Sequence, residues 1–433
     1  MNKKAILISA IASNQGKTLL TMSLLHHYKK SVRPFKCGPD FIDPQFHEKI
    51  AQTPSINLDG FMMNDTQLRW IFNNYIDKDV AILEGVMGFY DGMDKGSSAY
   101  DIAKILKIPT LLILDASGSY ITISAILKGM IEFRDDNTIK VVVLNKVSSK
   151  MHYLLVKKFI ELESLNIVVV GWIEKNLSSI SSRHLGLDLE ELDSTKLDTI
   201  SKDVLKYIDL ELLEQQMDIE ITDVDSYPFK KIVKKDEKCA LVTDKNFSFI
   251  YYDNIKFLQE LYRDVIFIDS TKDEVIDDDV DKVIIVGGYV ETDESYARIK
   301  NSHNFKASLI KHTQNNKSLY AECAGLIYLG KKIDDKVMSG ILDIEFILGE
   351  KRERLGYYYG IDFQTKEIKK GHAFHYSKII SAPKGDIGLY KSSQKNIKDG
   401  GFKKGNIVGT YLHTMWRCVS PIPSQLTHDK HHL

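Results

Sequence analysis

Gly16, Lys17 and Thr18, near the start of the chain, have the residue types and the order that bind nucleotide phosphates. They follow the apolar run 5–8 and open an amphipathic stretch, which predicts a buried strand, a tight loop and a helix. Unpaired N–H groups at a helix start favour phosphate, the lysine reaches the outer phosphates, and the threonine hydroxyl binds Mg²⁺. Ile11 stands where the pattern G-x-x-x-x-G-K-[ST] has its first glycine. Nucleotide binding is the favoured interpretation, and an ordinary strand-to-helix turn is the alternative.

Acidic side chains follow two further strand-like runs. Asp40 and Asp43 each stand beside a proline, in a loop after a short strand. Glu84 ends the apolar run 80–83, and Asp91 follows in a glycine-punctuated loop. Because ligands gather at the carboxyl ends of parallel strands, these carboxylates predict a Mg²⁺ site beside the nucleotide loop. For Asp40 and Asp43, turns in which the carboxylate bonds its own backbone are the alternative.

A thiol in the second half of the chain has the setting of a nucleophile. Cys323 lies between the strand-like run 318–322 and a helix-like run that starts at Ala324, and its small neighbours permit a sharp elbow. The N–H groups of Ala324 and of the Gly287–Gly288 turn have the chemistry of an oxyanion hole. A buried structural role is the alternative for a single cysteine.

A thiol nucleophile also requires a base, and three histidines are candidates. His372 and His375 lie in the motif GHAFHYS, and His413 directly follows the strand-like run 407–412. A histidine at a strand end lies at the edge of the sheet where Cys323 is expected. We therefore favour His413 as the partner of the thiol.

The elements that must position these residues alternate between strand-like and helix-like runs. This alternation predicts right-handed crossovers and a doubly wound, mostly parallel α/β sheet, and a second α/β pattern starts near residue 238. The expected organisation is a P-loop ATP-binding domain over residues 1–190, a helical segment and linker over 191–236, and a second α/β domain over 237–433. Asn145 is a further candidate for contact with the nucleotide base, and His184 is a further candidate for contact with an anion.

Length, charge and cysteine spacing exclude several classes of protein. The chain has 433 residues, which predicts two or three domains, and its formal net charge of −1 gives no electrostatic basis for binding nucleic acid or an anionic membrane. No apolar stretch approaches the ~20 residues that a membrane span needs. The four cysteines are widely spaced, which predicts reduced thiols in the cytoplasm rather than disulfides or a zinc site.

Longer motifs around these residues carry a resemblance to a known family. They are KCGPDFIDP at 36–44, NLD at 57–59, EGVMGFYDG at 84–92, AECAGL at 321–326 and GHAFHYS at 371–377. The second half resembles a class I, triad-type glutamine amidotransferase. Nearly the whole chain resembles the cobyrinate a,c-diamide synthase family of cobalamin biosynthesis.

This resemblance implies amidation of the a and c acetate side chains of cobyrinate, using glutamine, ATP and Mg²⁺. An acyl phosphate forms in the first domain, and ammonia is released from glutamine in the domain over 237–433. Together, the residues and the resemblance assign roles to four sets of residues. The nucleotide contacts are Asn14, Gln15, Gly16, Lys17 and Thr18, and the metal ligands are Thr18, Asp40, Asp43 and Glu84. The catalytic residues are Cys323, His413 and Asp91, and the oxyanion contacts are Gly287, Gly288 and Ala324. We expect small-molecule substrates as the binding partners, and neither nucleic acid nor a membrane. A homodimer is one possible oligomeric state.

The chain also departs from the family pattern. Val286 and Val290 stand where prolines would flank the glycine turn. The residue two after His413 is Met415, not an acid, as in the subgroup where a Cys–His pair suffices. After Trp416 the sequence does not match the helix that the resemblance implies there.

Three alternatives to this function are open. The substrate could be another tetrapyrrole, such as nickel-sirohydrochlorin or hydrogenobyrinate. The first domain could be a regulatory or partitioning P-loop ATPase, which would turn over ATP without an acid substrate. The chain could be a corrinoid-binding module with a degenerate amidotransferase domain, although the joint presence of Lys17, Glu84, Cys323 and His413 argues against this.

Overall fold

The computed structural model describes residues 3–177, 194–221, 223–224, 226–393 and 396–419. The chain forms two compact units, Met1–Pro228 (unit 1) and Phe229–Leu433 (unit 2). The division falls inside the segment 191–236 that the sequence assigns to a join. His184 and the segment after Val419 lie outside the described ranges. Within those ranges, no helix combines the length and the apolar character that crossing a membrane requires.

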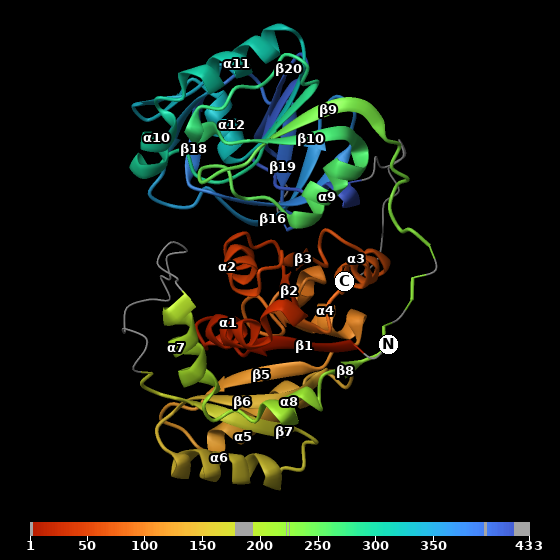
Figure 1. Ribbon diagram of the computed structural model, residues 1–433, viewed down its shortest axis with the longest axis vertical. Coiled ribbons are helices and arrows are strands. Elements are labelled where there is room, and N and C mark those ends of the chain that lie inside the picture. Colours follow the sequence, from red (N-terminus) through yellow and green to blue (C-terminus); the bar gives the residue numbers. More distant parts are fainter. Residues whose placement is uncertain (1–2, 178–193, 222, 225, 394–395, 420–433) are drawn as a thin grey trace. The chain divides into compact units, whose positions relative to one another are not determined.

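Unit 1 is built on a parallel sheet with the strand order β3-β2-β4-β1-β5-β6-β7 (Figure 1). The short β8 pairs antiparallel with β1. The strands are β1 (Lys3–Ala10), β2 (Val32–Cys37), β3 (Ile56–Leu58), β4 (Val80–Glu84), β5 (Thr110–Asp115), β6 (Ile139–Val147), β7 (Val168–Glu174) and β8 (Asp218–Ile219). Most are continuous apolar runs rather than alternating ones, because helices cover both faces of the sheet.

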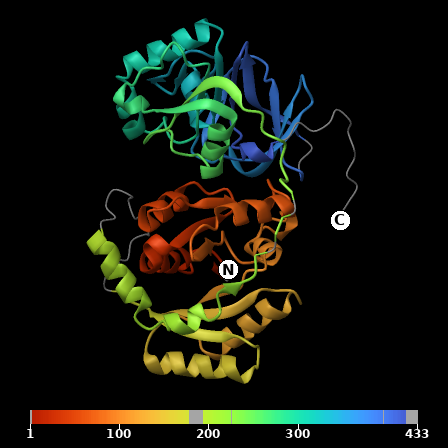
Figure 2. The ribbon, with the colours of Figure 1, turned by 45° about the vertical axis from the view of Figure 1, so that its right-hand side comes forward.

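The helices of unit 1 form two layers. Contacts join α1 with α2 and α7, α3 with α4, and α5 with α6, and right-handed crossovers place the first group on one face and the others on the opposite face. In both views α7 runs beside α1 (Figure 1, Figure 2). Their bounds are α1 (Lys17–Tyr28), α2 (Ile42–Ala51), α3 (Asp65–Tyr75), α4 (Ala99–Leu106), α5 (Ile121–Glu132), α6 (Lys150–Leu162), α7 (Ser194–Leu205) and α8 (Leu210–Glu214), with short 3₁₀ turns η1 (Lys29–Ser31) and η2 (Met93–Lys95). Capping boxes at Asn64 and Ser98 start α3 and α4.

Unit 2 is built on a mixed sheet with the order β10-β9-β11-β12-β21-β20-β19-β16-β17. The half from β10 to β21 is parallel, and the half from β20 to β17 is antiparallel. Its strands are β9 (Lys235–Val242), β10 (Tyr262–Ile268), β11 (Lys282–Ile285), β12 (Ser318–Glu322), β16 (Arg354–Asp362), β17 (Ile368–His375), β19 (Ile387–Tyr390), β20 (Lys398–Lys404) and β21 (Ile407–Thr410).

A smaller sheet with the order β14-β13-β15-β18 completes the strands of unit 2. These are β13 (Lys332–Ile333), β14 (Lys336–Val337), β15 (Glu345–Leu348) and β18 (Ser377–Ser381). The helices are α9 (Tyr252–Leu261), α10 (Asp293–Ile299), α11 (His303–Gln314) and α12 (Ala324–Leu329), with η3 (Ser270–Lys272) and η4 (Trp416–Cys418). A continuous buried core joins the parallel half, including Val283 and Leu319, to the antiparallel half, including Phe402.

The predicted fold class is confirmed. Unit 1 has the doubly wound, parallel sheet that the alternating runs predict, and unit 2 is an α/β fold. The sequence does not predict the antiparallel half of unit 2. Its strands are rich in lysine, tyrosine and glycine and lack the continuous apolar runs of the parallel strands.

Candidate active site

The nucleotide loop, residues 11–16, joins β1 to α1 and has a conformation that depends on glycine. Gly16 has φ +99°, in the left-handed region, and a Cβ there would lie 2.4 Å from Asn145 Nδ2. Asn145, at the end of β6, donates through Nδ2 to the carbonyl of Gln15 at 2.8 Å. The loop is therefore anchored by Asn145 of β6, the second strand away from β1 in the sheet. Asn14, with φ +62°, also adopts the left-handed conformation.

Lys17, at the first turn of α1, is held inside this loop. Its Nζ donates to the carbonyl of Ala12 at 3.1 Å and to that of Met87 at 2.5 Å, and the residue is only 7% exposed. Burial lowers the pKa of Lys17, while the Glu84 carboxylate opposes the shift. The ammonium group is thus bound to backbone carbonyls of the nucleotide loop and of the loop after β4.

Glu84 lies at the centre of the site in unit 1. The Thr18 hydroxyl donates to Glu84 Oε1 at 2.7 Å, and His47 Nε2 lies 2.7 Å from Oε2. In the register of β2 and β4, Lys36 lies beside Glu84, and its Nζ is 3.3 Å from Oε1. Burial alone would raise the pKa of Glu84, but the Lys36 ammonium and the His47 contact lower it to about 2. The carboxylate is therefore ionised.

Lys36 occupies the space between the carboxylates that the sequence assigns to a metal. Its Nζ lies 2.5 Å from Asp43 Oδ2 and 3.8 Å from Asp40 Oδ2. Burial lowers the pKa of Lys36, but the carboxylates, Glu84 foremost, outweigh burial and raise it. Burial and the nearby Glu84 raise the pKa of Asp43 to about 6. Lys36 therefore offsets part of the negative charge of this cluster.

The donor chemistry for Mg²⁺ is met by part of the predicted set. A hydroxyl from Thr18 and a carboxylate from Glu84 are the hard oxygen donors that Mg²⁺ prefers, and they converge on one point. Asp40 and Asp43 face Lys36 instead. Across the described ranges, no cluster of at least three His, Cys, Asp or Glu residues has the arrangement of a metal site. The residues fit an ion held by few protein ligands and completed by phosphate oxygens and water.

Asp91 organises the loop after β4. Its Oδ2 accepts a hydrogen bond from the Gly88 N–H at 2.8 Å, and a Cβ at Gly88 would lie 2.5 Å from the carbonyl of Ile11. The loop carrying Asp91 therefore packs closely against the nucleotide loop. In this way the structure brings Asp91 to the same edge of the sheet as Lys17 and Glu84.

Lys36 and His47 are the residues of this cluster that the sequence reading does not single out. His47 is fully buried on α2, where its Nδ1 lies 3.2 Å from Ser55 Oγ. A signal for Lys36 is present in the sequence, because a charged residue near the end of a buried strand requires a buried partner. No comparable signal exists for His47, whose partner is set by how α2 packs on the sheet.

In unit 2, Cys323 stands at a strained elbow between β12 and α12. Its φ of +48° is unusual for a residue with a side chain. The Cys323 N–H donates to the carbonyl of Thr410 at 2.7 Å, and Sγ lies 3.9 Å from the carbonyl of Phe374. The residue is 4% exposed. The elbow projects the thiol from the end of the parallel sheet, as the spacing predicts.

His413 lies at the same edge because β12 and β21 are parallel neighbours. Glu322 pairs with Thr410 in their register, so the chain reaches His413 three residues beyond the strand end. The ring packs so closely on Gly287 that a Cβ there would lie 2.2 Å from His413 Cε1. Burial alone would lower the pKa of His413, but the Cys323 thiol, which shares a hydrogen bond with the ring, and the Glu322 carboxylate raise it to about 10. The structure therefore pairs the thiol with His413.

Glu322, directly before the nucleophile in sequence, faces the other side of His413. Its Oε2 lies 3.5 Å from His413 Nδ1, and its side chain is almost fully buried. Oε1 accepts hydrogen bonds from Tyr320 Oη and Trp416 Nε1, both at 2.9 Å. The sequence does not predict this contact of Glu322 with His413, because the family pattern has its acid two residues after the histidine, where this chain has Met415.

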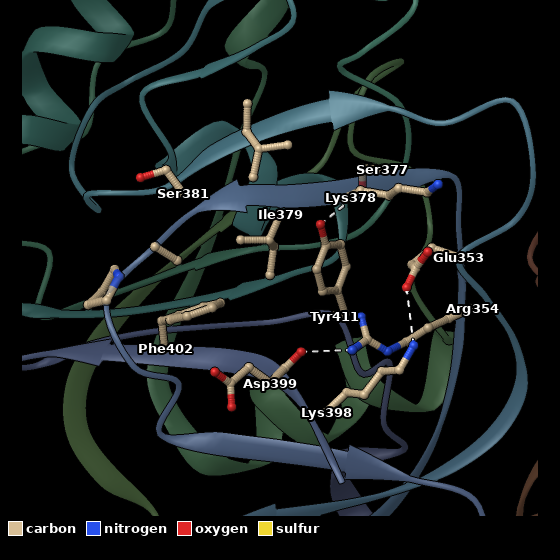
Figure 3. A pocket seen from close by; sticks show the side chains of 13 residues that line it. Glu353, Arg354, Ser377, Lys378, Ile379, Ser381, Lys398, Asp399, Phe402 and Tyr411 are labelled. Atoms are coloured by element: carbon tan, nitrogen blue, oxygen red, sulfur yellow. Dashed lines mark hydrogen bonds and ion pairs between the residues drawn. The ribbon is translucent and has the colours of Figure 1, made fainter. Parts of the chain in front are cut away.

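His375, another candidate histidine, has partners other than the thiol. His375 is neutral, since burial and Arg354 lower its pKa to about 3, and its ring nitrogens face Ser377 O and Arg354 Nη1. Its ring stacks on Tyr411. Behind this pair lies a pocket of about 400 Å³ lined by Arg354, Ser377 and Tyr411, among others (Figure 3). The backbone of His372 is bonded to that of His413, with N···O distances of 2.9 and 2.8 Å.

Two of the three residues predicted for the oxyanion hole lie beside Cys323 or His413. Gly288 has φ +151°, and a Cβ there would lie 1.9 Å from the carbonyl of Asn246. Gly287 packs on the His413 ring, and Ala324 opens α12 directly after Cys323. The structure therefore gathers Gly287, Ala324, Cys323 and His413 at one strand edge of unit 2.

Comparison with known proteins defines the class and then the family. The CobB/CobQ-like glutamine amidotransferase domain matches residues 238–418, which contain Cys323 and His413. Together with the relatives described next, this domain makes the protein a glutamine-hydrolysing amidoligase. Proteins named cobyrinate a,c-diamide synthase are 33% identical in Caldanaerobacter subterraneus subsp. tengcongensis (95% of this chain, 94% of the relative) and 34% identical in Saccharolobus solfataricus (95% and 97%) and in Fusobacterium nucleatum (95% and 97%). The chain belongs to the cobyrinate a,c-diamide synthase family.

Among solved structures, a glutamine amidotransferase from Thermotoga maritima aligns with 41% of this chain and 76% of its own length, at 15% identity and a TM-score of 0.30. A likeness this low has no bearing on the function.

Proposed function

We propose that this protein amidates the a and c acetate carboxylates of cobyrinate, using glutamine as the nitrogen donor and ATP as the energy source. The observation that carries the proposal is the similarity to proteins named cobyrinate a,c-diamide synthase along 95% of the chain. The geometry supports it, because a nucleotide loop with Lys17 and Glu84 lies in unit 1 and a thiol paired with His413 lies in unit 2.

The glutaminase half-reaction uses Cys323 and His413. The thiolate attacks the side-chain amide carbon of glutamine, a C–S bond forms, and the negative charge on oxygen is met by N–H groups at Gly287, Gly288 and Ala324. His413 gives its proton to the departing nitrogen, so that the C–N bond breaks and ammonia leaves. Water then attacks the thioester while His413 removes its proton, which releases glutamate and restores the thiol.

The synthetase half-reaction takes place at the nucleotide loop. A carboxylate oxygen of cobyrinate attacks the γ-phosphorus of ATP, ADP leaves, and an acyl phosphate forms. Ammonia then attacks the acyl carbon, and phosphate departs with the electron pair of the C–O bond. In this scheme Asn14, Gln15, Gly16 and Lys17 bind the phosphates, and Lys17 exchanges its carbonyl partners for phosphate oxygens.

The remaining residues of unit 1 manage charge and orientation in this proposal. Thr18 and Glu84 hold Mg²⁺, which neutralises phosphate charge when bound, and Asp40 and Asp43 act through Lys36. Asp91 fixes the loop after β4 and orients the carboxylate or the ammonia.

The proposal also covers the cellular compartment and the oligomeric state of the protein. We place the enzyme in the cytoplasm, because Cys37, Cys239 and Cys323 are free thiols. A homodimer stays a prediction. Exposed apolar side chains, among them Tyr120, Met151 and Leu154, line a groove of about 680 Å³ in unit 1, and sedimentation of the purified chain tests whether a second copy covers it.

The experiment that tests the function is amidation of cobyrinate by the Cys323→Ser variant, read as a mass increase of the tetrapyrrole. With glutamine as donor we expect at least a 1,000-fold loss of rate, because the hydroxyl is a far weaker nucleophile than the thiolate. With ammonium salt as donor we expect the wild-type rate, since unit 1 keeps its residues.

Equal loss with both donors would contradict the two-site scheme. A panel of tetrapyrrole acids in the same assay tests the substrate, and faster amidation of nickel-sirohydrochlorin or hydrogenobyrinate would move the proposal to that compound. ATP turnover that does not depend on any acid substrate would support the regulatory ATPase instead.

A further inference from the structure

Glu322 is a buried carboxylate whose two oxygens have different partners. Oε1 accepts hydrogen bonds from Tyr320 Oη and Trp416 Nε1 at 2.9 Å, and the Thr414 hydroxyl lies 3.4 Å away. Oε2 lies 3.5 Å from His413 Nδ1. A carboxylate with Oε1 fixed by donors has little rotational freedom, so Oε2 is aimed at the imidazole ring.

The donors that fix Glu322 are themselves held in place. Asn254 on α9 accepts from the Trp416 N–H at 2.8 Å and donates through Nδ2 to the carbonyl of Thr414 at 2.8 Å. Arg417, the next residue, pairs with Asp253 of the same helix at 2.9 Å. The segment after His413 is therefore attached to α9, and it presents the indole N–H to Glu322 in a defined position.

We propose that Glu322 is the positioning residue of the glutaminase site, forming a Cys323–His413–Glu322 relay in which the acid comes from the strand before the nucleophile. The inference rests on the proposed glutaminase function. Glu322 faces the Nδ1 side of the ring at 3.5 Å, which leaves Nε2 to take the proton of the thiol. When His413 takes that proton, the carboxylate stabilises the positive ring.

The other groups that face His413 cannot do this. The Cys323 thiol is the group that the ring activates. His375, on β17, is neutral, and its ring nitrogens face Ser377 and Arg354. Met415, two residues after His413, carries no acid. Glu322 is thus the carboxylate that the structure places at ion-pair distance from the imidazole.

The test compares Glu322→Gln with Glu322→Asp in the full-length enzyme. A glutamine amide keeps an oxygen for Tyr320 and Trp416 but turns an N–H donor toward His413 Nδ1, which moves the ring proton to Nε2. We expect a fall in the kcat of glutamine hydrolysis of about 100-fold or more. Aspartate keeps the negative charge but is shorter, so we expect it to retain more activity than the glutamine variant. Glu353→Gln, which removes an ion pair with Lys398 at the pocket of Figure 3, is the matched control and should hydrolyse glutamine at the wild-type rate.

The second readout is alkylation of Cys323 by iodoacetamide, followed by mass spectrometry of its peptide across pH. Loss of the carboxylate makes the imidazolium that pairs with the thiolate less stable, and we expect the alkylation rate at pH 7 to fall about tenfold. Both readouts are independent of the tetrapyrrole, and ammonium-driven amidation separately reports on the proposed function. Two results would overturn the inference: a glutamine variant with a wild-type hydrolysis rate and alkylation profile, or an aspartate variant weaker than the glutamine variant, since that order indicates a packing role.

Discussion

Gly287 leaves no room for a side chain, so the Gly287→Ala variant is a direct test of the Cys323–His413 pairing. The added Cβ would lie 2.2 Å from His413 Cε1, 3.1 Å from Nδ1 and 3.2 Å from Nε2. The ring must retreat by about 1.2 Å to restore an ordinary carbon contact near 3.4 Å. His413 is 1% exposed, so the displacement has to be absorbed inside the site.

The expected effect is loss of glutaminase activity with the synthetase activity retained. A displacement of about 1 Å in a catalytic group costs on the order of 100-fold in rate, so we expect the kcat for glutamine hydrolysis to fall by about that factor. Ammonium-driven amidation should stay at the wild-type rate, which also shows that the variant is folded. The assay is glutamate release, run beside amide formation with each nitrogen donor.

Gly129→Ala is the matched control. This glycine lies in α5, a Cβ there would meet nothing within 4 Å, and its backbone is not left-handed. The added methyl should leave activity unchanged and stabilise the helix by about 0.5–1 kcal/mol. A Gly287→Ala enzyme that hydrolyses glutamine within twofold of the wild-type rate would refute the pairing of the thiol with a tightly packed His413.

Two further predictions concern buried charge. Lys36→Met leaves the buried carboxylates of Asp43 and Glu84 without their lysine partner. The free energy of local opening, measured by amide hydrogen exchange in β2 and β4, should therefore fall by about 3–5 kcal/mol. An unchanged free energy would show that the cluster does not need the charge of Lys36. The pKa of His413 is raised from 6.5 to about 10 in the folded chain, so the folded state holds a proton that the unfolded state releases, and the free energy of unfolding should decline as pH rises from 6.5 to 10. His413→Gln should remove that part of the decline, and identical pH profiles for both proteins would contradict the charged ring.

The sequence predicts the parallel parts of the fold because parallel strands carry their own signal. Continuous apolar runs such as 80–83 and 141–144 are buried on both faces, and each is followed by a residue with chemistry, such as Glu84 or Asn145. The antiparallel half of unit 2 has no such signal. Its strand β16, Arg354–Asp362, has three consecutive tyrosines between two glycines, and its burial depends on partners from β17 and β19.

The same distinction holds for the two sites. Lys17, Glu84, Cys323 and His413 stand at strand ends or helix starts, so their local sequence places them at the catalytic edge. The side chains that contact these residues are placed by the register of neighbouring strands and by helix packing. Lys36 reaches Glu84 across a strand pair, and Glu322 reaches His413 through the register of β12 with β21. Sequence spacing alone gives no distance between such residues.

The division of the chain at Pro228 and Phe229 keeps each set of reacting groups within one unit. In the proposed scheme, every mole of amide formed from glutamine has a matching mole of glutamate, and the two products form in different units. The ratio of the two products is a property of the entire polypeptide, and ammonium escaping into the medium measures the nitrogen that the chain fails to capture.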